Sequence, residues 1–154
     1  MDEPVEVRVL RHDEARILRG IAPDVFDHPI DERWTREFFA DERHHLAVAI
    51  DRRRVIGIAS GVHYVHPDKR PELWINEVGV AASYRRLGIG TRLLRALCEH
   101  ARTLGCSEAW VLTEQDNVAA RRLYVSAGGK ERLAVYVEIR LEDAHRPNNG
   151  TSST

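Results

Sequence analysis

The fold is decided by the stretch Arg85-Arg86-Leu87-Gly88-Ile89-Gly90-Thr91, which joins a strand pattern before it to an amphipathic helix pattern after it. Glycines let a backbone approach an anion closely, and the N–H groups and positive dipole end at a helix start favour phosphate. Arg85 and Arg86 add charge-assisted donors. The stretch is therefore a candidate phosphate-binding turn; the alternative is that its glycines only lead the chain into a helix.

The spacing within this turn excludes two kinds of nucleotide loop. A P-loop needs a Lys followed by Ser or Thr, and no such pair follows here. A dinucleotide fingerprint needs a third glycine, and Leu93 stands at that position. Neither ATP nor NAD is indicated.

Hydrophobic periodicity around the turn predicts a mixed α/β sheet with helices on both faces. Strands are expected at residues 5–10, 45–50, 55–65, 73–80, 108–113 and 135–141, and the second and third form a hairpin around residues 51–54. Helices are expected at residues 13–18, 90–104 and 117–126. A further helix carries Ile30, Trp34 and Phe38 at four-residue spacing, which predicts a buried aromatic face.

Length and composition predict one domain over residues 1–141 and a disordered tail over 142–154. The 154 residues are 43% hydrophobic and 31% charged, as in a soluble globular protein, and 23 Lys and Arg balance 24 Asp and Glu. This balance argues against a nucleic-acid partner. Without a signal peptide or an apolar span we expect a cytoplasmic protein with no membrane contact. No histidine or cysteine spacing predicts a metal site.

Two motifs resemble the GNAT superfamily of N-acetyltransferases. Arg85-x-x-Gly88-x-Gly90 looks like its acetyl-CoA pyrophosphate loop, and Asn117-x-x-Ala120-x-x-Leu123-Tyr124 is similar to its closing helix. The chain departs from the pattern at Gly129, where an apolar residue is usual. The resemblance implies a mostly antiparallel sheet that is splayed at the acetyl-CoA site. It implies cofactor contacts at Val78, Gly79, Val80, Arg85, Arg86, Leu87, Gly88, Ile89, Gly90, Thr91, Asn117 and Ala120.

Glu77 and Tyr124 are the candidate catalytic residues. Glu77 lies in an otherwise apolar strand, where an isolated carboxylate must neutralise or find partners. The resemblance makes it the base that deprotonates the amine, directly or through water, and makes Tyr124 the acid that protonates the departing thiolate. The alternatives are a structural pairing of Glu77 with an arginine and a half-buried aromatic role for Tyr124. Asn117 is equally explained as a helix N-cap.

The acceptor is expected to be a small cationic amine, because acidic residues collect in segments that border the predicted cleft. The run from Glu72 to Val80 resembles the short aminoglycoside 3-N-acetyltransferases, which implies antibiotic resistance through acetylation of a deoxystreptamine amine. Substrate contacts are expected at Asp27, His28, Glu72, Asn76, Glu114, Asp116 and Tyr136. A polyamine, amino acid or protein N-terminus as acceptor, a non-catalytic CoA-binding module, and a homodimer all stay open.

Overall fold

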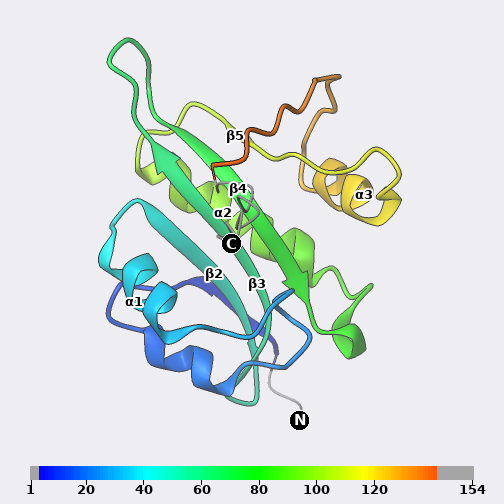
Figure 1. The fold of residues 1–154 in the computed structure, drawn as a ribbon. Helices are drawn as coiled ribbons and strands as arrows, with labels where there is room; N and C mark the ends of the chain where they lie inside the picture. The colour runs from blue at the N-terminus through cyan, green and yellow to red at the C-terminus, as the bar shows by residue number, and fades with distance from the viewer. Residues whose placement is uncertain (1–3, 142–154) are drawn as a thin grey trace, which may run out of the picture.

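A five-stranded sheet in the order β1-β2-β3-β4-β5 forms the centre of the computed structural model, which describes residues 4–141 (Figure 1). The strands are β1 (Glu6–Val9), β2 (His44–Asp51), β3 (Arg54–Tyr64), β4 (Glu72–Val80) and β5 (Ala109–Trp110). The first four pair antiparallel, and β4 and β5 run parallel. The sheet is mixed, as the sequence pattern predicted, and mostly antiparallel, as the resemblance implied.

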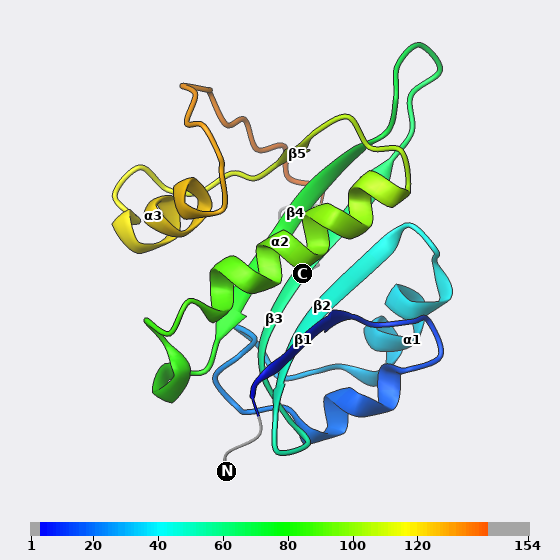
Figure 2. The same cartoon turned by 180° about the vertical axis from the view of Figure 1, so that it is seen from behind.

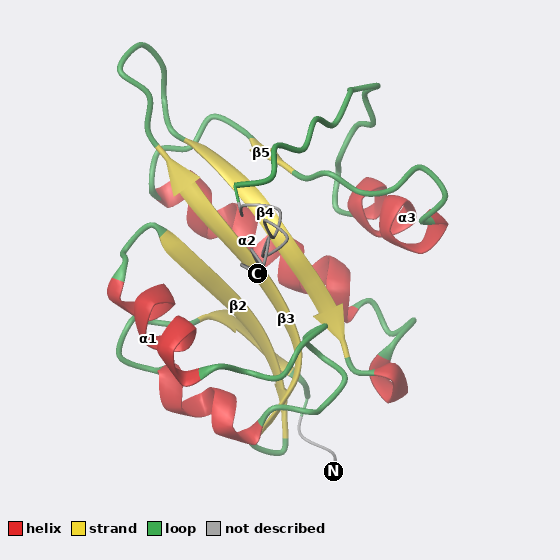
Figure 3. Cartoon of the chain, viewed as in Figure 1, coloured by secondary structure: helices red, strands yellow, loops and turns green. Residues whose placement is uncertain are grey.

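Helices cover both faces of this sheet, which confirms the predicted fold class. They are the 3-10 helices η1 (Ala15–Gly20) and η2 (Ala82–Tyr84) and the α-helices α1 (Glu32–Ala40), α2 (Ile89–Thr103) and α3 (Val118–Ser126). Helix α2 packs across β1 to β4 on the face seen in Figure 2. Elements η1 and α1 lie on the opposite face, and α3 lies beyond the β5 edge (Figure 3).

Small residues on the α2 face of the sheet allow the helix to approach closely. The register pairs Ala47 with Ala59 and Ala49 with Gly57, and partners in a ladder share a face. A Cβ at Gly57 would lie 3.1 Å from Cδ1 of Leu93, so the helix sits directly over this glycine. Leu93 is completely buried. The predicted amphipathic helix therefore supplies the buried apolar layer that covers this face of the sheet.

The hairpin between β2 and β3 turns at Arg52 and Arg53, close to the predicted position. Asp51 pairs with Arg54, which leaves a two-residue loop. Both loop residues have positive φ, 46° and 68°, the geometry of the tight turns that match the twist of a hairpin. Asn and Gly adopt this geometry most easily, so the pairing of two apolar strands imposes it here on two arginines.

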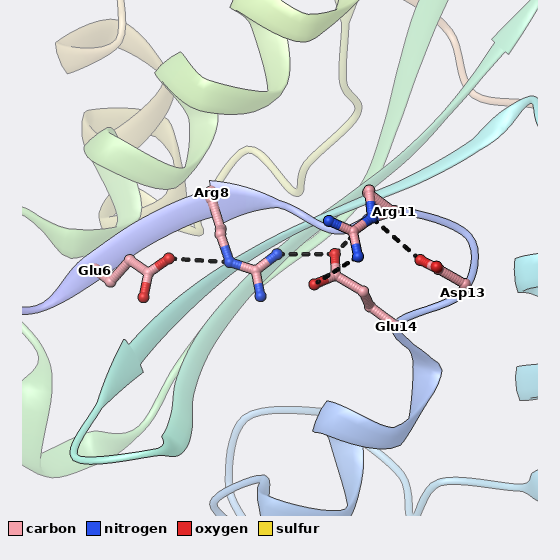
Figure 4. Close-up of polar contacts among 5 residues, drawn as sticks. All are labelled: Glu6, Arg8, Arg11, Asp13 and Glu14. Carbon is pink, nitrogen blue, oxygen red and sulfur yellow. Dashed lines mark hydrogen bonds and ion pairs between the residues drawn. The ribbon is translucent and has the colours of Figure 1, made fainter.

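A polar network fixes the turn from β1 into η1 (Figure 4). Arg8 lies between Glu6, 3.0 Å away, and Glu14, whose Oε2 accepts a hydrogen bond of 2.9 Å from Nη1. Glu14 also accepts a 2.7 Å bond from the backbone N–H of Arg11. The hydrogen bond from Arg8, followed by that from Arg11, lowers the pKa of Glu14. The network positions η1 against the sheet.

The predicted aromatic face of α1 is wrong. Trp34 is 58% exposed, and Ile30 lies before the helix and is also exposed. The helix buries Phe39 instead, with Phe38 packed edge-on against it at a centroid distance of 5.3 Å. Because α1 is only nine residues long and meets η1, the residues near its C-terminal end make the apolar contact. The Arg33 guanidinium covers Trp34, 4.6 Å from the ring centroid.

The predicted strand at 135–141 is also absent from the structure. Its alternating side chains are exposed, because a strand needs an edge to pair with and β5 has only two residues where six were predicted. The predicted tail at 142–154 lies outside the described residues. Within residues 4–141, no helix is long and apolar enough to cross a membrane.

Candidate functional site

The outer edge of β4 has unpaired backbone along most of its length. In the described part of the chain, β4 pairs with β5 only at Leu73 and Trp74, so the two parallel strands separate beyond that point (Figure 1). Residues 75–80 therefore have no β5 neighbour, although all of them except Asn76 stay paired with β3 on the other side. The carbonyl of Val80 accepts a 3.0 Å hydrogen bond from Nε of Arg85. The remaining peptide groups of this edge suit an extended amide-bearing ligand.

Glu77 faces the loop that joins η1 to α1. Its Oε1 accepts a hydrogen bond of 3.3 Å from the backbone N–H of Asp27. Burial raises the pKa of this carboxyl, and the Asp27 hydrogen bond opposes that shift. The Asp27 carboxylate raises the pKa further, whereas His28 lowers it. The structure thus brings three predicted site residues together, and it gives Glu77 the properties of a proton acceptor with a raised pKa.

Gly79 is required by the chain itself. A Cβ at this position would lie 1.9 Å from the carbonyl oxygen of Val25, so the η1–α1 loop crosses directly over β4. The resemblance implied the cofactor as the partner of Gly79. The partner that the structure shows is the loop that also presents Asp27 to Glu77.

The start of α2 has the geometry of an anion site. Gly88 is the N-cap with φ 74°, and Arg86 before it has φ 62°. The N–H groups of the first turn, Ile89 to Thr91, have no acceptor within the helix. The exposed Leu87 lies between the two left-handed residues. The turn therefore directs backbone donors and a positive dipole end outward.

Gly88 adopts the left-handed conformation at the N-cap, whereas Gly90 allows helix α3 to pack closely against α2. A Cβ there would lie 2.9 Å from Cδ1 of Leu123. Thr91 reinforces the same junction through a 2.7 Å hydrogen bond between its hydroxyl and that of Ser126. The two motifs that the sequence paired are thus in direct contact.

Asn117 is the N-cap of α3. Its Oδ1 accepts a 3.1 Å hydrogen bond from the N–H of Ala120, so the capping alternative describes its contact in this structure. Tyr124 lies on the same helix and is half-buried against the core. Burial raises the pKa of its hydroxyl, which keeps the group protonated and able to donate.

The predicted acceptor contacts are dispersed. Glu72 is buried and accepts hydrogen bonds from Tyr64 and Lys69, so both of its oxygens are engaged within the protein. Asn76 is exposed on β4, next to Glu77, where the register with β3 shifts. Glu114 and Asp116 are exposed in the loop before α3. Tyr136 is 71% exposed in the segment without strand pairing.

A groove of about 680 Å³ lies between η1 and α1. Asp27 and His28 line it together with Phe26 and Arg36, but Glu77 and the α2 turn do not. This groove therefore lies beside the Glu77 site and does not include the α2 turn.

Sequence reasoning missed two clusters. Trp74, Trp110 and Tyr64 meet on one face of the sheet, and alternation along β4 with Leu73 and Ile75 inward would have placed Trp74 outward. The second cluster is the chain of imidazoles from His63 through His45 to His100, under α2. Local sequence spacing carries no signal for it, because the three residues come from three elements. Among the described residues, no group of three or more His, Cys, Asp or Glu side chains is arranged to hold a metal ion.

The acetyltransferase (GNAT) family matches residues 10–128, more than half of the sequence. The chain belongs to this GNAT family. Solved structures that resemble this GNAT acetyltransferase include an aminoglycoside acetyltransferase, meta-AAC0020 from an uncultured soil metagenomic sample, in complex with sisomicin. Its TM-score is 0.77 at 16% identity, over 90% of this chain and 97% of that chain.

Two further structures share the fold of this GNAT acetyltransferase. AAC(6')-Iy in complex with the bisubstrate analog CoA-S-monomethyl-acetylneamine has a TM-score of 0.74 at 18% identity, over 90% of this chain and 99% of that chain. A transcriptional regulator from Bacillus halodurans C-125 has a TM-score of 0.67 at 21% identity, over 87% of this chain and 100% of that chain. No curated protein matches the sequence.

Proposed function

We propose that this GNAT acetyltransferase uses acetyl-CoA to acetylate a primary amine of an aminoglycoside. The observation that carries the proposal is the placement of Glu77. A carboxyl whose pKa is raised by burial lies on β4, beside the edge where β4 and β5 separate. Proton abstraction from an ammonium group is favoured by a base with a raised pKa, and direct acyl transfer needs both substrates bound side by side in reacting geometry.

The residues at the β4 edge and the α2 turn fit acetyl-CoA. The peptide groups on the open edge of β4 at Val78 to Val80, apart from the Val80 carbonyl that Arg85 occupies, would hold the pantetheine arm. The first-turn N–H groups of α2 with Arg85 and Arg86 would hold the pyrophosphate. When bound, acetyl-CoA supplies a thioester as the acetyl donor. The left-handed Gly88 and the outward N–H groups are the features of this chain that match such a ligand.

In the proposed reaction, Glu77 accepts the proton of the acceptor ammonium, and the neutral amine attacks the thioester carbonyl. The C–N bond forms, the C–S bond breaks, and Tyr124 donates its proton to the leaving thiolate. The new amide nitrogen loses its second proton to solvent, and Tyr124 regains a proton from solvent. Each transfer is of the kind that typically contributes about 10² to 10⁴ in rate. The backbone N–H of Asp27 orients the Glu77 carboxylate.

The identity of the acceptor is the most specific part of the proposal. Two of the structures with this fold are aminoglycoside acetyltransferases, one of them in complex with sisomicin. The resemblance of the β4 sequence favours the 3-amino group of deoxystreptamine, whereas AAC(6')-Iy carries a 6' designation in its name. Identifying the acetylated nitrogen by NMR of the product decides between these positions.

The test is release of CoA thiol by the purified protein with acetyl-CoA and a panel of aminoglycosides, polyamines and amino acids. Glu77→Gln is expected to lower kcat/KM about 10² to 10⁴-fold and to flatten its rise with pH, because the base is removed. Tyr124→Phe should lower kcat with acetyl-CoA binding retained. Glu99→Gln, on the solvent side of α2, is the matched control and should behave as wild type.

Turnover confined to polyamines or amino acids would replace the acceptor and keep the reaction. Absence of thiol release with the whole panel would contradict the enzyme assignment and leave a CoA-binding module. If the proposal holds, expression in susceptible bacteria raises the aminoglycoside concentration needed to stop growth, and the Glu77→Gln variant does not.

A further inference from the structure

Two tryptophans from neighbouring strands stack at the paired end of β4 and β5. Trp74 and Trp110 are register partners in the parallel pair, their ring centroids lie 6.0 Å apart, and their planes differ by 25°. Each is more than one third exposed, at 38% and 37%. Large aromatic rings that stay in contact with water are typical of binding surfaces. We refer to this pair as the tryptophan platform.

Hydrogen bonds through Tyr64 and Glu72 hold Trp110 of the platform in a fixed orientation. The indole N–H of Trp110 donates a 2.7 Å hydrogen bond to the hydroxyl of Tyr64, and that hydroxyl donates to the buried Glu72. Lys69 donates to the other oxygen of Glu72, and this bond is the largest influence lowering the pKa of the carboxyl. Tyr64 also packs edge-on against Trp110, with centroids 6.5 Å apart. An exposed ring with its rotamer already fixed loses little entropy when a ligand stacks on it.

The platform and Glu77 lie on the same face of the sheet. Gly57 and Gly61 lie on the α2 face of β3, and a Cβ at Gly61 would lie 3.1 Å from Cδ1 of the buried Leu73. Leu73 therefore points toward α2, and its neighbour Trp74 points to the opposite face. Glu77 meets the backbone of Asp27, which belongs to the loop on that opposite face. The register shift between Ser60 and Gly61 brings Glu77 to this side. At about 3.3 Å per residue, three residues of β4 place the platform about 10 Å from Glu77.

This arrangement combines a base, an aromatic surface and a separation of about 10 Å, which is about as long as two linked sugar rings. We propose that the tryptophan platform binds a second, cationic ring of the acceptor while the amine to be acetylated lies at Glu77; this inference rests on the proposed function. Tryptophan is the aromatic side chain that attracts cations most strongly, and its flat face also packs against the C–H face of a sugar ring. Tyr64 is a positioning residue, since it reaches the ligand only through Trp110.

The platform distinguishes acceptors with several rings from those with one. Trp110→Leu and Trp74→Leu are expected to raise the KM for sisomicin about tenfold, with little change in kcat, and to leave the KM for 2-deoxystreptamine unchanged. Trp34→Leu removes an exposed tryptophan from α1 and is the matched control, with both KM values unchanged. Trp110→Phe keeps a ring and should retain most of the affinity. It therefore tests the platform even where the leucine variant folds poorly. Tyr64→Phe should raise the sisomicin KM by a smaller factor.

Calorimetric titration with sisomicin, in the presence of CoA, separates the two proposals. Weakened binding in the Trp74 and Trp110 variants supports the platform, even if the wild type releases no thiol and the enzyme assignment fails. Thiol release with equal KM values in all variants overturns the platform and keeps the function. If the wild type neither binds nor acetylates sisomicin, both are overturned.

Discussion

Residues 4–106 and residues 107–141 are stabilised differently. All of the buried apolar side chains lie in the first region, which contains β1 to β4 and α2. From Ser107 to Leu141, across β5 and α3, no residue is buried. The first region therefore carries its own core. The second depends on contacts with the edge of the first, and a region with few buried contacts opens locally at low cost in free energy.

The proposed site joins these two regions. Glu77 and the α2 turn belong to the first, and Tyr124 belongs to the second. Leu123 against Gly90 and Ser126 against Thr91 connect the regions at α3. A ligand held between β4 and α3 would therefore stabilise the second region more than the first, because it binds only when that region is in place.

The largest difference between the regions should appear in leucine truncations. Leu93→Ala removes a completely buried side chain between α2 and the sheet and is expected to lower the free energy of unfolding by about 2–5 kcal/mol. Leu133→Ala, at a fully exposed position of the second region, should change it by less than about 0.5 kcal/mol. Urea unfolding followed by circular dichroism measures both. Equal effects would show that Leu133 has a partner that buries it in solution, such as a second copy of the chain.

A smaller effect is expected from pH, and it should arise in the first region. Burial, and then the neighbouring imidazoles His100 and His63, lower the pKa of His45 to about 3, and burial also lowers the pKa of His100. Because the unfolded chain binds these protons and the folded chain does not, stability is complete above about pH 6.5 and falls as the pH decreases toward the folded-state pKa. His45 contributes up to about 1.4 kcal/mol per pH unit in this range, and His100 acts in the same direction.

Urea midpoints between pH 7 and pH 5 test this, above the range where most carboxylates titrate. His45 faces His63, 2.8 Å away, and His100, 3.1 Å away, with His12 and His44 near it. His45→Gln keeps a polar side chain without a titrating ring, so its stability should depend less on pH. Equal slopes for variant and wild type would show that His45 titrates normally in the folded state.

The sequence predicts the first region better than the second for a physical reason. Strands β2 to β4 and helix α2 carry their own hydrophobic periodicity, and their bounds differ from the prediction by at most one residue. Residues 108–113 and 135–141 have strand-like patterns too, but a pattern becomes a strand only where an edge is available. The choice between partners depends on tertiary contacts that local sequence does not contain.

The candidate site divides in the same way. The Arg85–Thr91 turn and Glu77 are recognisable from local chemistry, because a glycine turn before a helix and a carboxylate in an apolar strand are visible in sequence. Other features of the site join distant segments of the chain. They are the hydrogen bond from the Asp27 backbone to Glu77, the close approach of the Val25 carbonyl to Gly79, and the hydrogen bonds that link Trp110, Tyr64 and Glu72. They depend on strand register, which a one-residue shift at Ser60 changes.

The smallest predicted effect compares the N-cap of α3 with the global stability. Asn117→Ala removes the acceptor for the Ala120 N–H and is expected to destabilise α3 by about 1 kcal/mol, which is about a fivefold faster amide exchange in that helix. Because α3 buries no residue, the global unfolding midpoint should change much less. Asn117→Asp keeps an acceptor oxygen and is the control. If Asn117→Ala instead lowers the global midpoint by the full 1 kcal/mol, α3 unfolds together with the core, and the two regions form one cooperative unit.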